Sequence, residues 1–361
     1  MVMTRLSYAS TKNKDMKYAV KIDILDDFFF LETEKRKYIF LDHREFGFFQ
    51  ERNKDKNIEG VLVKGGSRND FALALIREYS PNSNEIAVPA YFPLDLADFL
   101  RERGVTLKIT RPYYEGRAVK NSEEINMIES SVKKTHSAFL KIEEILNASE
   151  IKAGLIIFKG EALTSEFLKR EVEEVLFNKG MLNTEGMIIS SGKDAAISHH
   201  QGQGKLSANQ TIVCDIFPVS KKTGYFADVT RTYIKGKPNK KIMKMYDSVL
   251  RAQEAAFRVI KPGIIAKEIH KAVADSIIND GFDVGDTGFT HGTGHGLGLE
   301  VHEAPHVNRT SEDVLRPGSV FTIEPGLYYA NLGGVRIEDV VFVTNKGYRN
   351  LTNFSDRFII E

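Results

Sequence analysis

Two acidic residues that end strand-like apolar runs constrain the fold of this chain more than any other feature. Asp215 follows the run Thr-Ile-Val-Cys, and Glu324 follows Val-Phe-Thr-Ile. An unpaired charge buried in such a run carries a heavy desolvation cost, so each carboxylate needs a cation nearby. Each acid is followed by another at hairpin distance, Asp228 thirteen positions after Asp215 and Glu338 fourteen positions after Glu324.

Both spacings are typical of antiparallel hairpins. A turn centred between Lys221 and Lys222 would place Asp215 directly opposite Asp228, and a hairpin centred on Asn331 would do the same for the second pair. Opposed residues have Cβ atoms ~5 Å apart, where like charges repel. A shared metal ion would turn that repulsion into attraction. Either pair alone fits salt-bridged structural acids equally well, so the case for a metal needs further residues.

The positions of the histidines give further evidence for a metal site. Six of the nine fall in two short windows: His199 and His200, then His291, His295, His302 and His306. The second window reads HGTGHGLGLEVHE and interleaves histidines with four glycines. Because glycine allows positive φ and close backbone approach to a ligand, this pattern indicates a loop that builds a site.

The ligand types select the metal chemistry. Four carboxylates and at least one imidazole are too oxygen-rich for a structural thiolate site, but they suit one or two divalent ions such as Mn, Co, Fe or catalytic Zn. Metal binding can bring the pKa of a coordinated water to about 7. Cys214 precedes Asp215 on the same strand and must point to the opposite face, so we expect a buried thiol and not a ligand.

The pattern of helices and strands predicts two domains. Residues 1–118 alternate short β-rich runs with helical patterns, as expected for an α/β domain, and residues 119–361 carry the acids and the histidine windows. In the second domain the predicted order is two helices, strands, two helices and strands, which indicates an α+β fold. Asn121 followed by Glu124 forms a capping-box pattern that predicts the start of a long helix. The polar turn around His43 reads as a solvated loop.

Charge and cysteine content exclude several classes of function. Fifty basic against forty-nine acidic residues leave a net charge of +1, so nothing favours a nucleic-acid partner. No apolar run approaches the ~20 residues that span a membrane, and the start of the sequence lacks a secretory signal pattern. One cysteine cannot form an internal disulfide, so we expect a cytoplasmic protein.

Taken together, the motifs resemble those of the pita-bread metallopeptidases, in the Xaa-Pro aminopeptidase and prolidase (Xaa-Pro dipeptidase) branch. The matching segments are GYFADVTRT around Asp228, HGTGHGLGLEVHE, TIEPG and GVRIED. The resemblance covers the whole chain and implies a creatinase-type N-terminal α/β domain before a pita-bread catalytic domain. It also implies two divalent metal ions per subunit, a homodimer, and a peptide or dipeptide substrate with proline in the second position.

The resemblance also implies roles for individual residues. Asp215 would bind one metal, Asp228 and Glu338 would bridge both, and His295 with Glu324 would complete the second. Glu324 would further act as general base. The remaining expected roles are substrate contacts for His291, His302 and an upstream histidine, a supporting arginine, Arg336, and a residue that orients a ligand carboxylate, Thr230.

Two points stay open in this resemblance. His199 and His200 compete for the role of upstream histidine, and we favour His199; Phe217 stands where a glycine is frequent in the family. The alternative function is that of metal-free relatives, which act as binding or chaperone modules or as creatinase-like amidinohydrolases. Those relatives replace ligand residues, whereas all five are present here.

Overall fold

The computed structural model describes residues 4–81 and 85–361. The chain divides into one compact unit that ends at Glu115 and another that begins at Gly116. The division lies three residues before the predicted boundary at residue 118.

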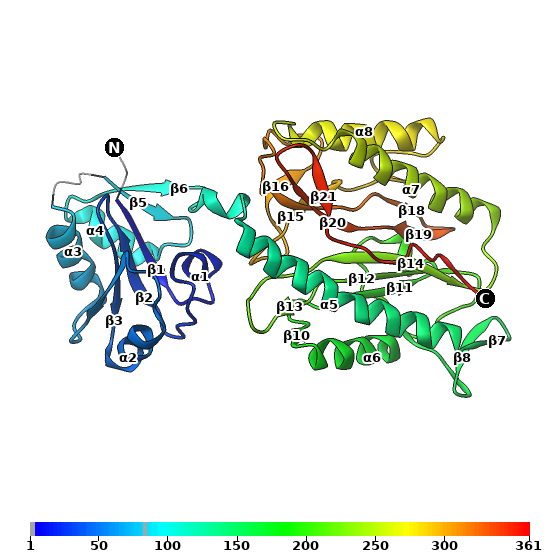
Figure 1. The fold of residues 1–361 in the computed structure, drawn as a ribbon, viewed down its shortest axis with the longest axis horizontal. Helices are drawn as coiled ribbons and strands as arrows, with labels where there is room; N and C mark the ends of the chain where they lie inside the picture. The colour runs from blue at the N-terminus through cyan, green and yellow to red at the C-terminus, as the bar shows by residue number, and fades with distance from the viewer. Residues whose placement is uncertain (1–3, 82–84) are drawn as a thin grey trace. The chain divides into compact units, whose positions relative to one another are not determined.

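The first unit is built on a six-stranded mixed sheet in the order β4-β3-β2-β1-β5-β6 (Figure 1). Its strands are β1 (Arg5–Ala9), β2 (Phe28–Glu32), β3 (Lys37–Leu41), β4 (Ile58–Leu62), β5 (Glu85–Pro89) and β6 (Thr106–Thr110). Its helices are α1 (Lys14–Val20), α2 (His43–Arg52), α3 (Arg68–Tyr79) and α4 (Leu94–Glu102). Both faces of the sheet are packed with buried apolar side chains, in agreement with the predicted α/β class.

The loop predicted around His43 is wrong. His43 is the first residue of α2, and the Asp42 side chain accepts hydrogen bonds from the backbone amides of Arg44 and Glu45. Asp42 is therefore an N-cap, the position that aspartate favours because its carboxylate satisfies free amides of the first turn. His43 itself is exposed, as predicted.

Four helices frame the second unit: α5 (Ser122–Asn147), α6 (Ser165–Asn178), α7 (Lys240–Val259) and α8 (Ala266–Asn279). The predicted capping box of α5 is present, with Asn121 Oδ1 accepting from the Glu124 amide at 3.0 Å and Glu124 Oε2 accepting from the Asn121 amide at 2.9 Å. Along one face of α5, Ile128, Val132 and Phe139 are at most 1% exposed.

The two main sheets of the second unit lie between the helix pairs α5–α6 and α7–α8 (Figure 1). A four-stranded sheet has the order β11-β12-β14-β22, and a five-stranded sheet has the order β16-β15-β17-β20-β21. Their strands are β11 (Ile188–Ser191), β12 (Thr211–Ile216), β14 (Val229–Lys235), β22 (Ile359–Ile360), β15 (Gly294–Gly296), β16 (Glu303–Val307), β17 (Val320–Ile323), β20 (Asp339–Val343) and β21 (Tyr348–Asn350).

Smaller elements complete the second unit. They are the 3₁₀ turns η1 (Glu115–Ala118, which crosses the division) and η2 (Asp194–Ala196), and the strands β7 (Glu150–Lys152), β8 (Leu155–Phe158), β9 (Glu161–Ala162), β10 (Met181–Leu182), β13 (Val219–Ser220), β18 (Gly326–Tyr329) and β19 (Gly333–Arg336). Within the described residues, no helix combines the length and the apolar character that a membrane span needs.

The predicted register of the first acid pair is wrong by two residues. Asp215 on β12 lies opposite Thr230 on β14, and Asp228 precedes that strand. The reason is the turn, which spans residues 221–224 and closes with a hydrogen bond from the Gly224 amide to the Ser220 carbonyl at 2.8 Å. Gly224 has φ of 75°, a left-handed conformation that glycine adopts readily. Asp228 and Thr230 lie two residues apart, so the acids still share a face of the sheet diagonally.

The register predicted for the second acid pair is confirmed. Ile323 on β17 pairs with Asp339 on β20, and Gly326 on β18 pairs with Arg336 on β19. Both pairings belong to one antiparallel register, in which Glu324 lies opposite Glu338. The interruption between these strand pairs falls at Pro325, whose carbonyl accepts from the Ile337 amide at 3.4 Å.

Candidate metal centre

The acids and the central histidine converge from both main sheets. The four-stranded sheet brings Asp215 on β12 and Asp228 just before β14. The five-stranded sheet brings His295 on β15, Glu324 just after β17 and Glu338 just before β20. All five residues lie in a strand or directly beside one, so the pairing of the strands fixes the position of their backbone.

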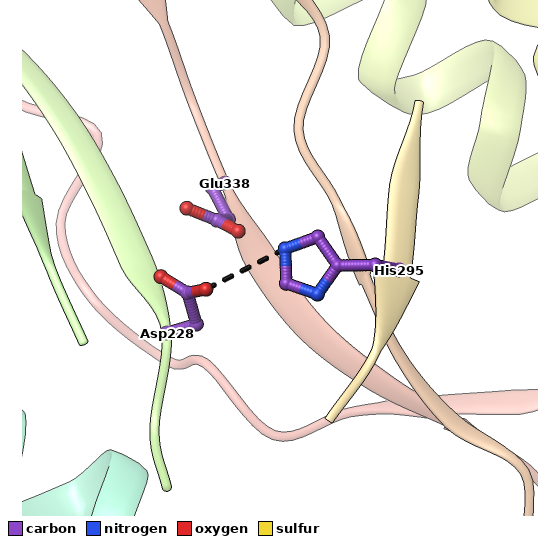
Figure 2. Close-up of side chains that lie close together, drawn as sticks. All are labelled: Asp228, His295 and Glu338. Atoms are coloured by element: carbon purple, nitrogen blue, oxygen red, sulfur yellow. Dashed lines mark ion pairs between the residues drawn. The ribbon is translucent and has the colours of Figure 1, made fainter. Parts of the chain in front are cut away.

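Three of the predicted ligands form a tight group. Ligand atoms of Asp228, His295 and Glu338 all lie within 4.8 Å of one another, and their side chains point toward one another in Figure 2. The Nε2 atom of His295 lies 3.6 Å from an oxygen of Asp228 and 3.5 Å from an oxygen of Glu324. These separations leave room for a cation between groups that do not touch.

The orientation of the His295 ring suits a metal ligand. Its Nδ1 atom lies 3.2 Å from the Gly296 carbonyl oxygen, which can only accept, so Nδ1 carries the proton. Burial lowers the pKa of His295 to about 3, so the ring is neutral and Nε2 presents a lone pair. That lone pair faces the carboxylates of Asp228 and Glu324, an arrangement that is repulsive unless a cation lies between them.

Unpaired carboxylate oxygens support the same conclusion. Oδ1 of Asp215 and Oδ1 of Asp228 are buried and have no hydrogen-bond partner among the described residues. Such oxygens are costly in a folded protein unless something else satisfies them. The residues present therefore fit a divalent metal, for which carboxylate oxygen and imidazole nitrogen are suitable ligands.

Burial and the charges of neighbouring acids together raise the pKa values of three of the acids. Burial, followed by the charge of Glu338, raises the pKa of Asp228 well above its usual range. Burial, followed by the charge of Glu324, does the same to the pKa of Glu338. Burial raises the pKa of Glu324 to about 7, although the Arg336 charge opposes the rise. A bound cation would act in the opposite direction, because it favours the ionised form of each acid.

Arg336 fixes one acid by a buried ion pair. Its guanidinium donates to Oδ2 of Asp215, to the Thr230 hydroxyl at 3.1 Å and to the Tyr328 hydroxyl at 2.8 Å. Arg336 is 3% exposed and Asp215 is 8% exposed. One oxygen of Asp215 is therefore held by the arginine, and the other is left for a ligand.

Thr230 and Arg231 connect the four-stranded sheet to the five-stranded sheet at Glu338 and Asp339. The Thr230 hydroxyl donates to Oε2 of Glu338 at 2.7 Å. Arg231 reaches across to the Glu338 carbonyl at 2.9 Å and to Oδ1 of Asp339 at 2.9 Å. The sequence analysis identified Thr230 but not Arg231. Arg231 is a charged residue within the fully buried strand β14.

The acids line one wall of a cavity of about 450 Å³. His199, His291 and His302 line the same cavity, whereas Nδ1 of His200 accepts from the Gly202 amide at 3.0 Å. Burial lowers the pKa values of His291, to about 3, and of His302, so neutral imidazoles face the acids. The ring of His302 packs against that of His295 with centroids 4.1 Å apart.

Tyr328 is a buried residue that contacts two residues of the cavity lining, His291 and Arg336, and that the sequence analysis missed. Nδ1 of His291 lies 2.7 Å from the Gly292 carbonyl and so carries the proton, which makes Nε2 the acceptor of the Tyr328 hydroxyl at 2.9 Å. Both ring nitrogens of His291 therefore have protein partners. The available signal was strand alternation, because Gly326 lies opposite Arg336 and places Tyr328 diagonally on the same face.

Cys214 is buried and points away from the acids. It is 0% exposed, and burial raises the pKa of its thiol. Strand alternation directs its side chain to the face opposite that of Asp215. This agrees with the expectation of an inert buried thiol.

The fold and the acid–imidazole cluster define a pita-bread catalytic unit of the metallopeptidase type. Residues 126–345 match the model of metallopeptidase family M24. The chain belongs to this family.

Known relatives agree with that assignment. An Xaa-Pro dipeptidase of Pyrococcus horikoshii is 32% identical over 305 residues, which cover 81% of this chain and 86% of the relative. An Xaa-Pro dipeptidase of Pyrococcus furiosus is 38% identical over 218 residues, and the match spans 61% of that relative's length. The crystal structure of the prolidase from P. horikoshii superposes with a TM-score of 0.81 at 28% identity, covering 98% of this chain and 94% of the other.

Proposed function

We propose that the protein is an exopeptidase that depends on two divalent metal ions and hydrolyses the bond between an N-terminal residue and proline. The observation that carries this proposal is the convergence of His295 Nε2 with carboxylate oxygens from two sheets at one cavity. The names of the similar Xaa-Pro dipeptidases support the substrate class.

In this proposal Asp215, Asp228, His295, Glu324 and Glu338 hold the metals. When bound, the metals would supply Lewis-acid chemistry, lowering the pKa of a water and polarising the scissile carbonyl. Arg336 orients Asp215, and Thr230 orients Glu338, through the hydrogen bonds described above.

Glu324 is the proposed general base. Its carboxylate faces the cavity, where it can take up and return a proton. His302 and His199 line the cavity and are the proposed substrate contacts. Because Tyr328 already engages His291, we propose that His291 contacts substrate only by exchanging that hydrogen bond.

The proposed substrate suits the rest of the cavity. Met187, Ile188, Phe217 and Val301 add apolar surface to its lining. Such a surface can pack against the prolyl ring or the neighbouring side chain. Apolar packing suits a prolyl residue because its nitrogen has no N–H to donate.

Activity on defined peptides tests the proposal. The purified protein is stripped with a chelator, reloaded with Mn, Co or Zn, and incubated with Ala-Pro, Ala-Pro-Ala and the control Ala-Ala. We expect metal-dependent release of alanine from one or both prolyl peptides and much slower release from Ala-Ala. Lack of cleavage with every metal would contradict the proposal, and the relative rates assign dipeptidase or aminopeptidase preference.

We further propose a cytoplasmic homodimer, by resemblance to the family. Size-exclusion chromatography with light scattering checks the dimer, for which the expected mass is about twice the 40.7 kDa of one chain.

A further inference from the structure

Glu303 lies between two cations beside the cavity. Its Oε1 is 2.6 Å from Nζ of Lys120, and its Oε2 is 2.6 Å from the Arg117 guanidinium. The Lys120 side chain is 2% exposed and that of Glu303 is 7% exposed. Burying an ion pair rarely stabilises a fold more than apolar packing would, so its retention here calls for another reason.

The pair supports the loop that carries His302. Glu303 follows His302 directly, and its carboxylate packs on Gly298, where an added Cβ would lie 2.2 Å from Oε1. The Gly298 amide donates to the Glu300 carbonyl at 3.1 Å, and the Gly298 carbonyl accepts from the Phe226 amide at 2.9 Å. The carboxylate of Glu303 thus braces the segment 297–302, of which Val301 and His302 line the cavity.

The start of α5 also holds the segment that leads to Asp228. The Tyr225 hydroxyl donates to Oε1 of Glu124 at 2.7 Å, and the Ser131 hydroxyl donates to the Tyr225 carbonyl at 3.0 Å. Residues 117–131 therefore contact both the 225–228 segment, with its proposed metal ligand, and the 297–302 segment, with its proposed substrate contact.

We propose that Lys120 and Glu303 form a positioning pair for catalysis, which sets the place of His302 relative to the acids. The inference rests on the proposed function, because the consequence for turnover requires that His302 contacts the substrate. Neither residue touches the reacting atoms. A displacement of about 1 Å in a catalytic group can cost up to about a hundredfold in rate, so loss of the pair should reach turnover.

The test uses neutral, near-isosteric variants of the full-length, metal-loaded protein, Glu303→Gln and Lys120→Met. We expect either variant to lower kcat by about tenfold or more, with a smaller change in KM and unchanged metal content. Hydrogen exchange of the backbone amides in residues 297–302 should rise in both. The double variant should lose no more than the worse single one, because the two residues act together.

The control variants remove more exposed ion pairs, which lie on α5. Glu129 lies 2.6 Å from both Lys133 and Arg349, and Lys141 lies 3.3 Å from Glu144. Glu129→Gln and Lys141→Met should leave kcat and the exchange of 297–302 unchanged. Unaltered exchange of that segment in Glu303→Gln and Lys120→Met would overturn the positioning role. An inactive wild type would refute only the peptidase proposal, since the exchange measurement does not need turnover.

Discussion

Thr230 links two charged groups of the candidate site through one hydroxyl. The hydroxyl donates to Glu338 and accepts from Arg336. Thr230→Val keeps the shape of the side chain but leaves a ligand carboxylate without its orienting partner. We expect manganese affinity to fall by about ten- to a hundredfold, as when other supporting residues of metal ligands are lost. Isothermal titration of the stripped protein measures it.

Thr232→Val is the matched control for that prediction. The Thr232 hydroxyl lies on the same strand, but it bonds the backbone carbonyl and amide of Arg336. Its loss should reduce stability more than metal affinity. Equal affinities in the two variants would show that the Thr230 hydroxyl does not orient Glu338.

Glu324 should make the stability of the metal-free protein depend on pH. Its pKa is raised from the ordinary value of 4.5 to about 7, so the folded state binds its proton more tightly than the unfolded state. That contribution is fully present below pH 4.5 and is lost as the pH rises through 7. Glu324→Gln mimics the protonated acid at every pH.

Denaturant unfolding of the two stripped proteins isolates this one group. Relative to wild type, Glu324→Gln should gain about 3 kcal/mol of unfolding free energy between pH 4.5 and pH 8. The comparison between variants matters because the buried histidines, whose pKa values are lowered, make stability rise with pH instead. A constant difference between the two proteins would contradict the raised pKa of Glu324.

At the scale of elements, the capping box of α5 offers a direct test of local sequence rules. Asn121→Ala removes the acceptor of the Glu124 amide at the first turn. Loss of such a cap costs about 1 kcal/mol. We expect a lower midpoint of thermal unfolding, measured by circular dichroism, while Ser122→Ala at the exposed neighbouring position should change it much less. Equal shifts would mean that the cap contributes little.

Element ends were predictable from sequence where side chains define them. The helix α5 begins after the predicted cap Asn121, whose side chain accepts from the Glu124 amide. Short elements such as α1, with seven residues, offer too little periodicity to be recognised. The register of β12 and β14 was missed because the position of a turn depends on a single left-handed glycine, Gly224.

At the candidate site, the residues that could be predicted from sequence are those whose side chains are unusual for their surroundings. Buried acids and clustered histidines stand out because an ordinary core has no use for them. Tyr328 and Lys120 do not stand out, since tyrosine and lysine are common and their contacts come from distant segments. Of His199 and His200, only His199 lines the cavity, and that placement depends on segments distant in the sequence.

At the scale of the whole molecule, a bound cation would join two sheets. Asp215 and Asp228 come from the four-stranded sheet, while His295, Glu324 and Glu338 come from the five-stranded sheet. A ligand that binds only the folded state adds about 2.7 kcal/mol at a hundred times its Kd. We therefore expect chelator treatment to lower the Tm in calorimetry, and added manganese to restore it.

The double variant Asp228→Asn, Glu338→Gln serves as the control for this prediction. It should melt at the same temperature with and without manganese. Equal responses of wild type and variant would place the binding of manganese elsewhere in the molecule.

Cys214 has a practical consequence for work on this protein. It is the only cysteine of the chain and lies fully enclosed beneath β12, on the side away from the acids. Maleimide reagents should therefore leave the native molecule unlabelled. A single cysteine engineered on the surface would accept a fluorophore at one defined place, with no need to replace the natural thiol.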